Sequence, residues 1–278
     1  MFVSSGSPIT AQDFEYSWKR VLNPEVGSGS ASDLWVIKNG KEYNEGTMTA
    51  DDVGVKATDD LTLVVETSYY APWFVTLTAT TVFFPVKKDV VEASGDAWTK
   101  SVDTYVSNGA FMLTEYSSLD KLVMTKNPNY YAADDVKIDQ VIYYIIADST
   151  AVLVAYDNDE LTVADDIDIN AKNEYGTTDQ YVTSERIGIQ YWDFNCQLPE
   201  FSDARVRQAF SIAIDRQAVL TAVGLTSEVP VYGFVPDSQP SLTTDGSYRS
   251  VAGDMFTEDV AAAQALMAEA GYEGGAGF

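Results

Sequence analysis

Carboxylates are the most abundant chemically active side chains of this chain. Its 278 residues include 42 Asp and Glu, 17 Lys and Arg, one Cys and no His, and the formal net charge is −25. The lack of histidine removes the commonest general base, the commonest metal ligand and every Ser-His or Cys-His nucleophile pair. Catalysis would therefore depend on paired carboxylates such as Asp51 with Asp52, and 42 acids produce such pairs by chance.

Three further motifs fall short of known sites. GSGSA at 27–31 lacks the G-x-S-x-G spacing of a nucleophile elbow. DIDIN at 166–170 begins like a calcium loop, but Ala171 stands where glycine is required and Thr177 where glutamate is required. GYEGGAG at 271–277 is rich in glycine but follows a helix pattern, so we expect a fraying end and not a nucleotide loop. We expect no catalytic residue, no metal and no cofactor.

Composition narrows the class of protein further. Hydrophobic residues make up 46% and aromatic residues 12% of the chain, which indicates a folded core, and the length allows about two domains. The acidity argues against nucleic acid or an anionic membrane as partner. The single cysteine, Cys196, cannot form an internal disulfide, and we expect a small buried thiol. Pairing of Cys196 with a group outside this chain is the alternative.

One aromatic and polar segment could bind a ligand. IGIQYWDFN at 187–195 predicts a strand, on which Tyr191, Asp193 and Asn195 project to the same face. Such a face suits a polar ligand held against aromatic walls. From the pattern alone, however, a strand with one face in the core and the other in water is the better interpretation.

The elements that must position these residues have clear signals. Thr10 and Asp13 have the spacing of a capping box and predict a helix that ends at Asn23. Residues 138–147 are apolar on both faces and predict a central strand, and the aromatic stretch 69–86 suits a buried irregular wall.

The remaining patterns complete the sequence-based map. Ser202 is expected to cap a helix and Asp215 to start the next one, and Gly271 is expected to end the last helix. Hairpins are predicted in 53–66 and 105–126, and helices in 87–98, 148–156 and 257–270. Hairpins and helices without a regular βαβ rhythm favour α+β or mixed α/β segments in at least two lobes.

Several of these segments, in this order, resemble one known family. The segments are SGSPITAQDFEYSWKRVLNP (5–24), DVGVKATDDLTLVVET (52–67), VSNGAFMLTEY (106–116), KNPNYY (126–131), PEFSDARVRQAFSIAIDRQAV (199–219) and AAQALMAEAGY (262–272). They are similar to segments of the family 5 extracellular solute-binding proteins, the peptide-binding receptors of ABC importers. At 159–162 the chain has DELT where the family prefers Gly-Glu-Ile-Asp, and we expect Asp159 to adopt the left-handed turn that glycine serves.

The resemblance implies a fold and a division of the chain. The expected fold is a mixed α/β, type II periplasmic-binding-protein-like architecture with two lobes and an extra subdomain, incomplete at both ends. Residues 1–87 resemble the extra subdomain of the peptide-binding branch, 88–190 the middle of the first lobe, and 191–278 the beginning of the second lobe. A signal peptide and lipobox cysteine would precede Met1, and most of the second lobe would follow Phe278.

The resemblance also implies a function. We expect a non-catalytic substrate-binding component that captures oligopeptides in a cleft between its lobes and delivers them to ABC permease subunits in the membrane. Tyr191, Asp193 and Asn195 fall on the strand that borders the cleft. Ser30 is a fourth expected ligand-binding residue, where peptide-binding members often carry an aromatic one. The complete protein is expected to be a monomer, either periplasmic or a cell-surface lipoprotein.

Other interpretations stay open at this point. The ligand of this family can also be a nickel complex or a sugar, although the lack of histidine disfavours nickel and the extra subdomain favours peptides. A secreted acidic hydrolase would use two carboxylates, one with a strongly raised pKa. A non-binding fragment of the receptor is the third alternative, because a truncated lobe would expose apolar surface.

Overall fold

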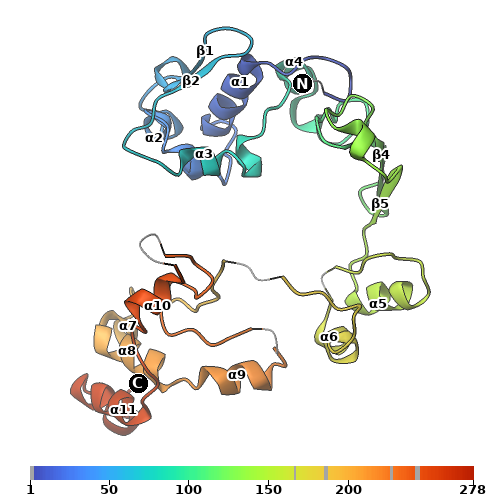
Figure 1. Ribbon diagram of the computed structural model, residues 1–278. Helices are drawn as coiled ribbons and strands as arrows, with labels where there is room; N and C mark the ends of the chain where they lie inside the picture. The colour runs from blue at the N-terminus through green and yellow to red at the C-terminus, as the bar shows by residue number, and fades with distance from the viewer. Residues whose placement is uncertain (1–2, 166, 185–186, 226–227, 242–244) are drawn as a thin grey trace. The chain divides into compact units, whose positions relative to one another are not determined.

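The computed structural model describes residues 3–165, 167–184, 187–225, 228–241 and 245–278. The chain forms two compact units, Met1–Ala147 and Asp148–Phe278, drawn from blue to green and from yellow-green to red in Figure 1. We describe each unit by itself. The division into an extra subdomain, a middle part of one lobe and the start of another stays a prediction.

The first unit combines short helices with two small antiparallel sheets. The helices are α1 (Ala11–Leu22), α2 (Gly40–Asn44), α3 (Phe74–Leu77) and α4 (Lys88–Ser94). The strands are β1 (Val55–Ala57), β2 (Leu63–Val65), β3 (Phe111–Tyr116), β4 (Lys121–Lys126) and β5 (Gln140–Tyr144). Five 3₁₀ turns lie between them: Ala31–Leu34, Ala50–Asp52, Thr81–Phe83, Gly95–Ala97 and Ala133–Asp135.

Helix α1 begins and ends where the sequence predicts. A capping box opens it, in which the Thr10 backbone N–H donates to Asp13 Oδ2 at 2.8 Å. Asn23 is its extended C-terminal cap, as expected for a residue before proline. Because both helix signals are local, they do not depend on the rest of the fold.

The buried face of α1 organises the core of the first unit. Trp18 is 3% exposed, and its ring makes edge-to-face contacts with three phenylalanines at centroid distances of 5.2 to 6.4 Å. Its indole N–H donates to the backbone carbonyl of Phe83 at 2.8 Å, so the polar edge of the ring is satisfied in the interior. The buried members of this core are Trp18, Leu22, Leu34, Val36, Ile37, Val53, Val55 and Phe83.

The two predicted hairpins are confirmed, and the strand predicted in 138–147 forms as β5 but does not lie at the centre of its sheet. β1 pairs with β2 with Val55 opposite Val65, and β3 pairs with β4 with Phe111 opposite Lys126. The order of the second sheet is β3-β4-β5, so β5 lies at an edge of it among the described residues. The expectation of a central strand is therefore wrong. Tyr143 and Tyr144 on β5 are 57% and 48% exposed.

The aromatic stretch 69–86 forms a partly exposed wall. Phe83 is 1% exposed and belongs to the core, but Tyr70 is 86% exposed and Trp73 is 50% exposed. The expectation that stretch 69–86 is buried is thus correct for its C-terminal end, at Phe83, and wrong for its N-terminal start, at Tyr70 and Trp73. The stretch folds into the short helix α3 and a 3₁₀ turn. Each of these elements packs on the core with one side only, so the side chains on the other side stay exposed.

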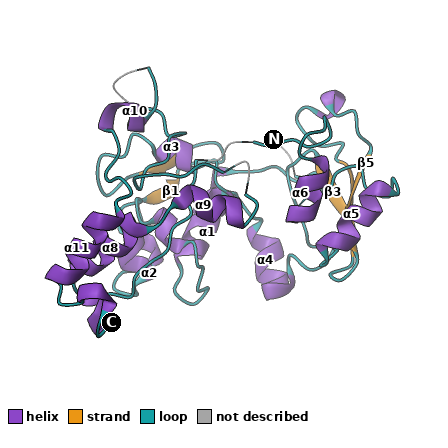
Figure 2. Ribbon diagram, turned by 90° about the horizontal axis from the view of Figure 1, so that it is seen from below, coloured by secondary structure: helices purple, strands orange, loops and turns teal. Residues whose placement is uncertain are grey.

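The second unit contains helices and loops without a named strand in its described residues (Figure 2). The helices are α5 (Ser149–Asp157), α6 (Ile169–Tyr175), α7 (Pro199–Ser202), α8 (Ala204–Ala213), α9 (Arg216–Ala222), α10 (Tyr248–Ala252) and α11 (Val260–Glu269). A 3₁₀ turn, Glu273–Gly275, follows α11. The last helix starts three residues later than expected, and Gly271 after it has a positive φ of 94°.

Aspartates cap most of these helices. The N-terminal caps whose carboxylates accept backbone N–H groups are Asp148, Asp168, Asp203, Asp215 and Asp259. A negative side chain is favourable there because the helix dipole is positive at the N-terminus. The predicted capping role of Ser202 is wrong. Ser202 ends α7, and its hydroxyl donates back to the Pro199 carbonyl at 2.7 Å, while Asp203 caps α8.

Helices α8 and α11 lie side by side in both views and form a small core (Figures 1 and 2). Its buried members are Ala209, Ile212 and Ala263. The end of the chain packs nearby, with the ring of Phe278 against Phe201, Phe210 and Tyr272 at 5.2 to 5.7 Å. The expectation of a fraying end is therefore wrong.

Two local findings complete the fold. Asp159 has a φ of 61°, so the prediction that an aspartate occupies the left-handed position is confirmed. No helix within the described ranges is long and apolar enough to cross a membrane.

Candidate functional site

The predicted ligand-binding segment 187–195 lies on the surface of the second unit without forming a strand. Tyr191 and Trp192 are 54% and 71% exposed, and Asp193 and Asn195 are exposed as well. The prediction of a strand is wrong here, because the alternating pattern finds no partner strand among the described residues. Because no β-ladder forms, the backbone does not force the side chains of Tyr191, Asp193 and Asn195 onto one face.

Asn195 has a local structural task. Its side-chain oxygen accepts the backbone N–H of Gln197 at 3.0 Å, and its backbone carbonyl accepts that of Leu198 at 3.1 Å. These bonds form the turn that leads into α7. An Asn side chain that bonds the backbone two residues later is typical of such turns. One lone pair of the side-chain oxygen is thus engaged, and its second lone pair and the amide N–H₂ are the groups that can meet a ligand.

Tyr191 has an aromatic neighbour that the sequence did not indicate. The ring of Phe234 lies 5.2 Å from that of Tyr191, with the planes inclined by 55°. Phe234 is itself 64% exposed. Two exposed rings in contact form an apolar wall, the kind of surface against which ligands are held. The local pattern around 234 carries no periodicity that would have singled out this residue.

Ser30, the fourth predicted residue, belongs to the first unit. It is exposed and precedes the 3₁₀ turn Ala31–Leu34, and its backbone N–H donates to Ser28 Oγ at 3.4 Å. Its hydroxyl gives that surface a small polar group. The assignment of all four residues to a ligand site stays a prediction.

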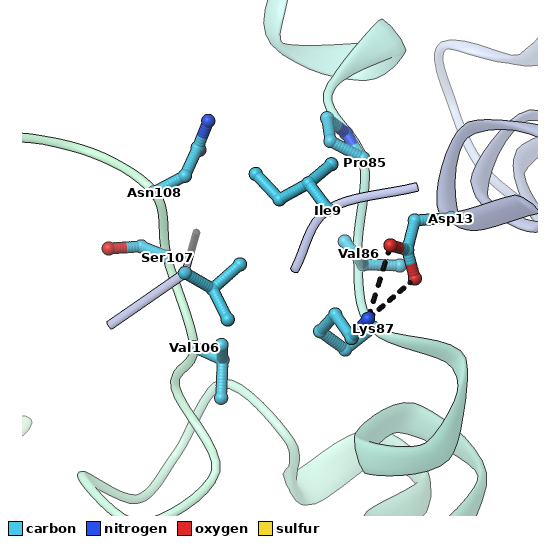
Figure 3. Close-up of a pocket in the computed structure, with 9 residues that line it drawn as sticks. Ile9, Asp13, Pro85, Val86, Lys87, Val106, Ser107 and Asn108 are labelled. Carbon is cyan, nitrogen blue, oxygen red and sulfur yellow. Dashed lines mark hydrogen bonds and ion pairs between the residues drawn. The ribbon is translucent and has the colours of Figure 1, made fainter. Parts of the chain in front are cut away.

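A pocket in the first unit holds an ion pair (Figure 3). Asp13 and Lys87 face each other in it, with Nζ 3.0 Å from Oδ1 and 3.1 Å from Oδ2. Lys87 Nζ also donates to the Pro8 carbonyl at 3.2 Å. The Asp13 carboxylate additionally closes the capping box of α1. Because both charges are satisfied by each other, this pocket is a structural clamp and offers little to a charged ligand.

The other chemical candidates do not gather into a site. Cys196 is exposed, with its sulfur 3.5 Å from the Phe194 carbonyl, so the expectation of a buried thiol is wrong. Asp166 of the calcium-like motif lies outside the described residues, and Asp168 caps α6 through Asn170 and Ala171. Within the described ranges, no three His, Cys, Asp or Glu side chains are placed to hold a metal ion.

Several side chains of the second unit have shifted pKa values. The side chain and backbone N–H of Arg205 lower the pKa of Asp203 to about 2. A hydrogen bond to Asp157 raises the pKa of Tyr175 to about 12. Desolvation and the Glu258 carboxylate raise the pKa of Tyr232. The Asp203 and Tyr175 shifts come from hydrogen-bonded partners at helix ends, and none of the three gives a carboxyl group suited to acid catalysis near neutral pH.

The chain is similar to bacterial solute-binding proteins. The model of the bacterial extracellular solute-binding proteins, family 5 Middle, matches residues 4–278. The dipeptide-binding protein DppE of Bacillus subtilis is 31% identical over 95% of this chain and 48% of its own length. The periplasmic murein peptide-binding protein MppA of Escherichia coli is 36% identical over 97% of this chain and 50% of its own length.

Solved structures agree with this match. The Escherichia coli murein tripeptide binding protein MppA has a TM-score of 0.80 at 32% identity, over 97% of this chain and 53% of that chain. A periplasmic oligopeptide-binding protein of Borrelia burgdorferi has a TM-score of 0.79 at 29% identity, over 99% and 54%. The expected mixed α/β, type II periplasmic-binding-protein fold class is thereby confirmed. This chain spans about half the length of the curated relatives it matches, and it belongs to the family 5 bacterial extracellular solute-binding proteins.

Proposed function

We propose that this chain is part of the substrate-binding component of a peptide ABC importer. The observation that carries the proposal is the family match over 4–278, together with relatives described as dipeptide-, murein peptide- and oligopeptide-binding proteins. Two structural neighbours contain peptides, one from Haemophilus influenzae with RPPGFSPFR and one from Listeria monocytogenes. Both are at least 25% identical to this chain and have TM-scores of 0.75 and 0.74.

The role proposed for the chain is capture without catalysis. The whole protein holds an oligopeptide and delivers it to permease subunits in the membrane, and it acts as a monomer. Its place is outside the cytoplasm, either in the periplasm or as a lipoprotein at the cell surface. The family description and the periplasmic relatives support this location.

Four residues are proposed to contact the peptide, and the structure suggests a fifth. Tyr191, Asp193, Asn195 and Ser30 are exposed polar or aromatic side chains. Phe234 joins them because its ring lies against Tyr191. The two rings would cover an apolar part of the peptide, and the carboxylate and amide would bond its polar groups.

Calorimetric titration tests the proposal. A pool of peptides of three to nine residues is added to this chain and to a chain extended through the reading frame to the length of the relatives. We expect heat from the extended chain and little or none from the 278 residues, because these span about half of each relative. No heat from either chain would overturn the proposal.

Two additions sharpen this titration. Tyr191→Ala in the extended chain is expected to weaken peptide binding about tenfold, the loss of one buried aromatic contact. The matched control is Tyr131→Ala, at a 72% exposed tyrosine in the first unit. Deoxycholate serves as a competitor, because a 32% identical relative is described as a probable deoxycholate-binding protein. Binding of deoxycholate but not of peptides would assign a different ligand to this chain.

A further inference from the structure

The side chain of Tyr232 anchors the loop that carries Phe234. The Tyr232 ring makes an edge-to-face contact with Phe256 at 6.0 Å. The Arg216 guanidinium lies over both rings, 5.8 Å from the centre of Tyr232 and 4.7 Å from that of Phe256. A cation over two aromatic faces is a favourable contact when partly buried. The start of the loop is thus anchored in the second unit.

Arg249 holds the backbone of the same loop. This residue of α10 is 8% exposed, and its Nη2 donates to the Tyr232 carbonyl at 3.2 Å and to Asp254 Oδ1 at 3.2 Å. The Met255 backbone N–H donates to the same carbonyl at 2.9 Å. Burial of a guanidinium is costly unless it is paired, and here it is paired with a carboxylate and a carbonyl. A buried Arg with these partners fixes the position of the Tyr232 carbonyl.

Gly233 makes room for this guanidinium. A Cβ atom at position 233 would lie 2.4 Å from Arg249 Nη1 and 2.6 Å from its Cζ. No other residue type fits at 233 while the guanidinium stays in place, because such distances are far inside van der Waals contact. The guanidinium therefore packs directly on the backbone that precedes Phe234, and Phe234 emerges from it toward Tyr191 at a ring distance of 5.2 Å.

We propose that Arg249 is a positioning residue for peptide binding: it fixes the loop 232–234 so that the ring of Phe234 stands against Tyr191 as a preformed wall for an apolar or aromatic peptide side chain. The inference rests on the proposed function. Arg249 itself does not need to touch the ligand. Preorganisation of the two rings would lower the entropy lost when a peptide binds.

A double-mutant cycle in the length-extended receptor tests the inference. Arg249→Met alone is expected to weaken binding of an aromatic-containing peptide about tenfold, as Phe234→Ala does. In the Phe234→Ala background, Arg249→Met is expected to add less than about twofold, because it acts through Phe234. Equal losses in both backgrounds would overturn the positioning role.

A second variant and a ligand-free readout separate positioning from folding. Gly233→Ala displaces the guanidinium without changing charge, and it is expected to reproduce the pattern of Arg249→Met. Gly109→Ala is the matched control, since a Cβ there meets only the Phe111 carbonyl at 3.9 Å. Chymotrypsin cleavage after Phe234, measured without ligand on variants that keep the wild-type circular dichroism and Tm, is expected to accelerate in both loop variants.

The outcomes distinguish the inference from the proposed function. If the wild-type receptor binds no peptide, the proposed function fails, whereas faster cleavage after Phe234 still supports the role of Arg249 in holding the loop. If peptides bind but cleavage and affinity are unchanged in folded Arg249→Met and Gly233→Ala receptors, the inference fails and the proposed function stands.

Discussion

The N-terminal region, residues 8–87, and the C-terminal region, residues 199–278, bury their apolar side chains in different ways. Eight buried residues form one continuous core in the N-terminal region, and they come from α1, β1, the 3₁₀ turns and the loops between them. In the described part of the C-terminal region, the corresponding cluster has three buried members, two of them alanines. The first region is thus held by large side chains in its interior, and the second by pairwise contacts between helices and rings.

The difference follows from the helices that each region provides. One face of α1 carries Phe14, Trp18 and Leu22, which are large and line the core. Helix α11 has the sequence VAAAQALMAE, and Ala263 is its one fully buried position. Since apolar burial contributes roughly 25 cal/mol per Å², a helix rich in alanine gains less from packing. Stability in the C-terminal region therefore depends more on helix caps and on contacts between partly exposed rings.

Loss of the central ring should damage the N-terminal region most. Trp18→Ala removes contacts with Phe14, Phe74 and Phe83 and a hydrogen bond to a buried carbonyl. We expect the free energy of unfolding to fall by about 3–5 kcal/mol. Urea titration followed by circular dichroism measures it. Trp73→Ala, at a half-exposed tryptophan, is the control, and an equal loss there would contradict the described core.

A larger side chain between α8 and α11 should have a moderate effect in the C-terminal region. Ala263 is 4% exposed and packs in the α8–α11 cluster, so Ala263→Leu overfills the interface. We expect a loss of about 1–3 kcal/mol in the free energy of unfolding. The same change at Ala265, on the exposed side of α11, should stay within about 0.5 kcal/mol. If the two substitutions lower the free energy of unfolding equally, α8 and α11 do not pack as described.

The smallest effect concerns the cap of α8 and its pH dependence. The pKa of Asp203 is about 2, below its ordinary value of 3.8, because Arg205 stabilises the carboxylate. A lowered pKa means that the cap stabilises α8 fully above about pH 4 and is lost as the pH falls toward 2. Carbon-13 NMR titration of the Asp203 carboxyl is expected to show this midpoint. Arg205→Met should move the midpoint upward, and an unchanged midpoint would show that the arginine is not the cause.

Local signals in the sequence predicted several elements of the chain. Thr10 with Asp13, and Asp215 before α9, satisfy backbone groups within a few residues, so these helix starts follow from the sequence alone. The hairpins in 53–66 and 105–126 carry their partner strand within the same segment. Asp159 shows the same principle, because its left-handed φ depends on the residue type and one turn.

Several features that depend on distant partners were not predicted correctly. Segment 187–195 has the alternation of a strand, but a strand also needs a neighbour to bond its backbone, and none pairs with it in the described residues. Burial likewise depends on what covers a residue, which is why β5 and Cys196 are more exposed than expected. Phe234 became a candidate only through its contact with Tyr191, 43 positions earlier in the chain.

The ion pair between Asp13 and Lys87 joins the two ends of the N-terminal region. Lys87 Nζ reaches both Asp13 and the Pro8 carbonyl, so the chain enters and leaves residues 8–87 at one point. Segments whose ends meet are the ones that a host fold tolerates as inserted modules, because the host backbone continues as if the module were absent. Because the two ends of residues 8–87 meet at this charge pair and at a hydrogen bond from the Val86 backbone N–H to the Ser17 hydroxyl, we expect insertions or deletions within the region to leave the path of the flanking chain unchanged.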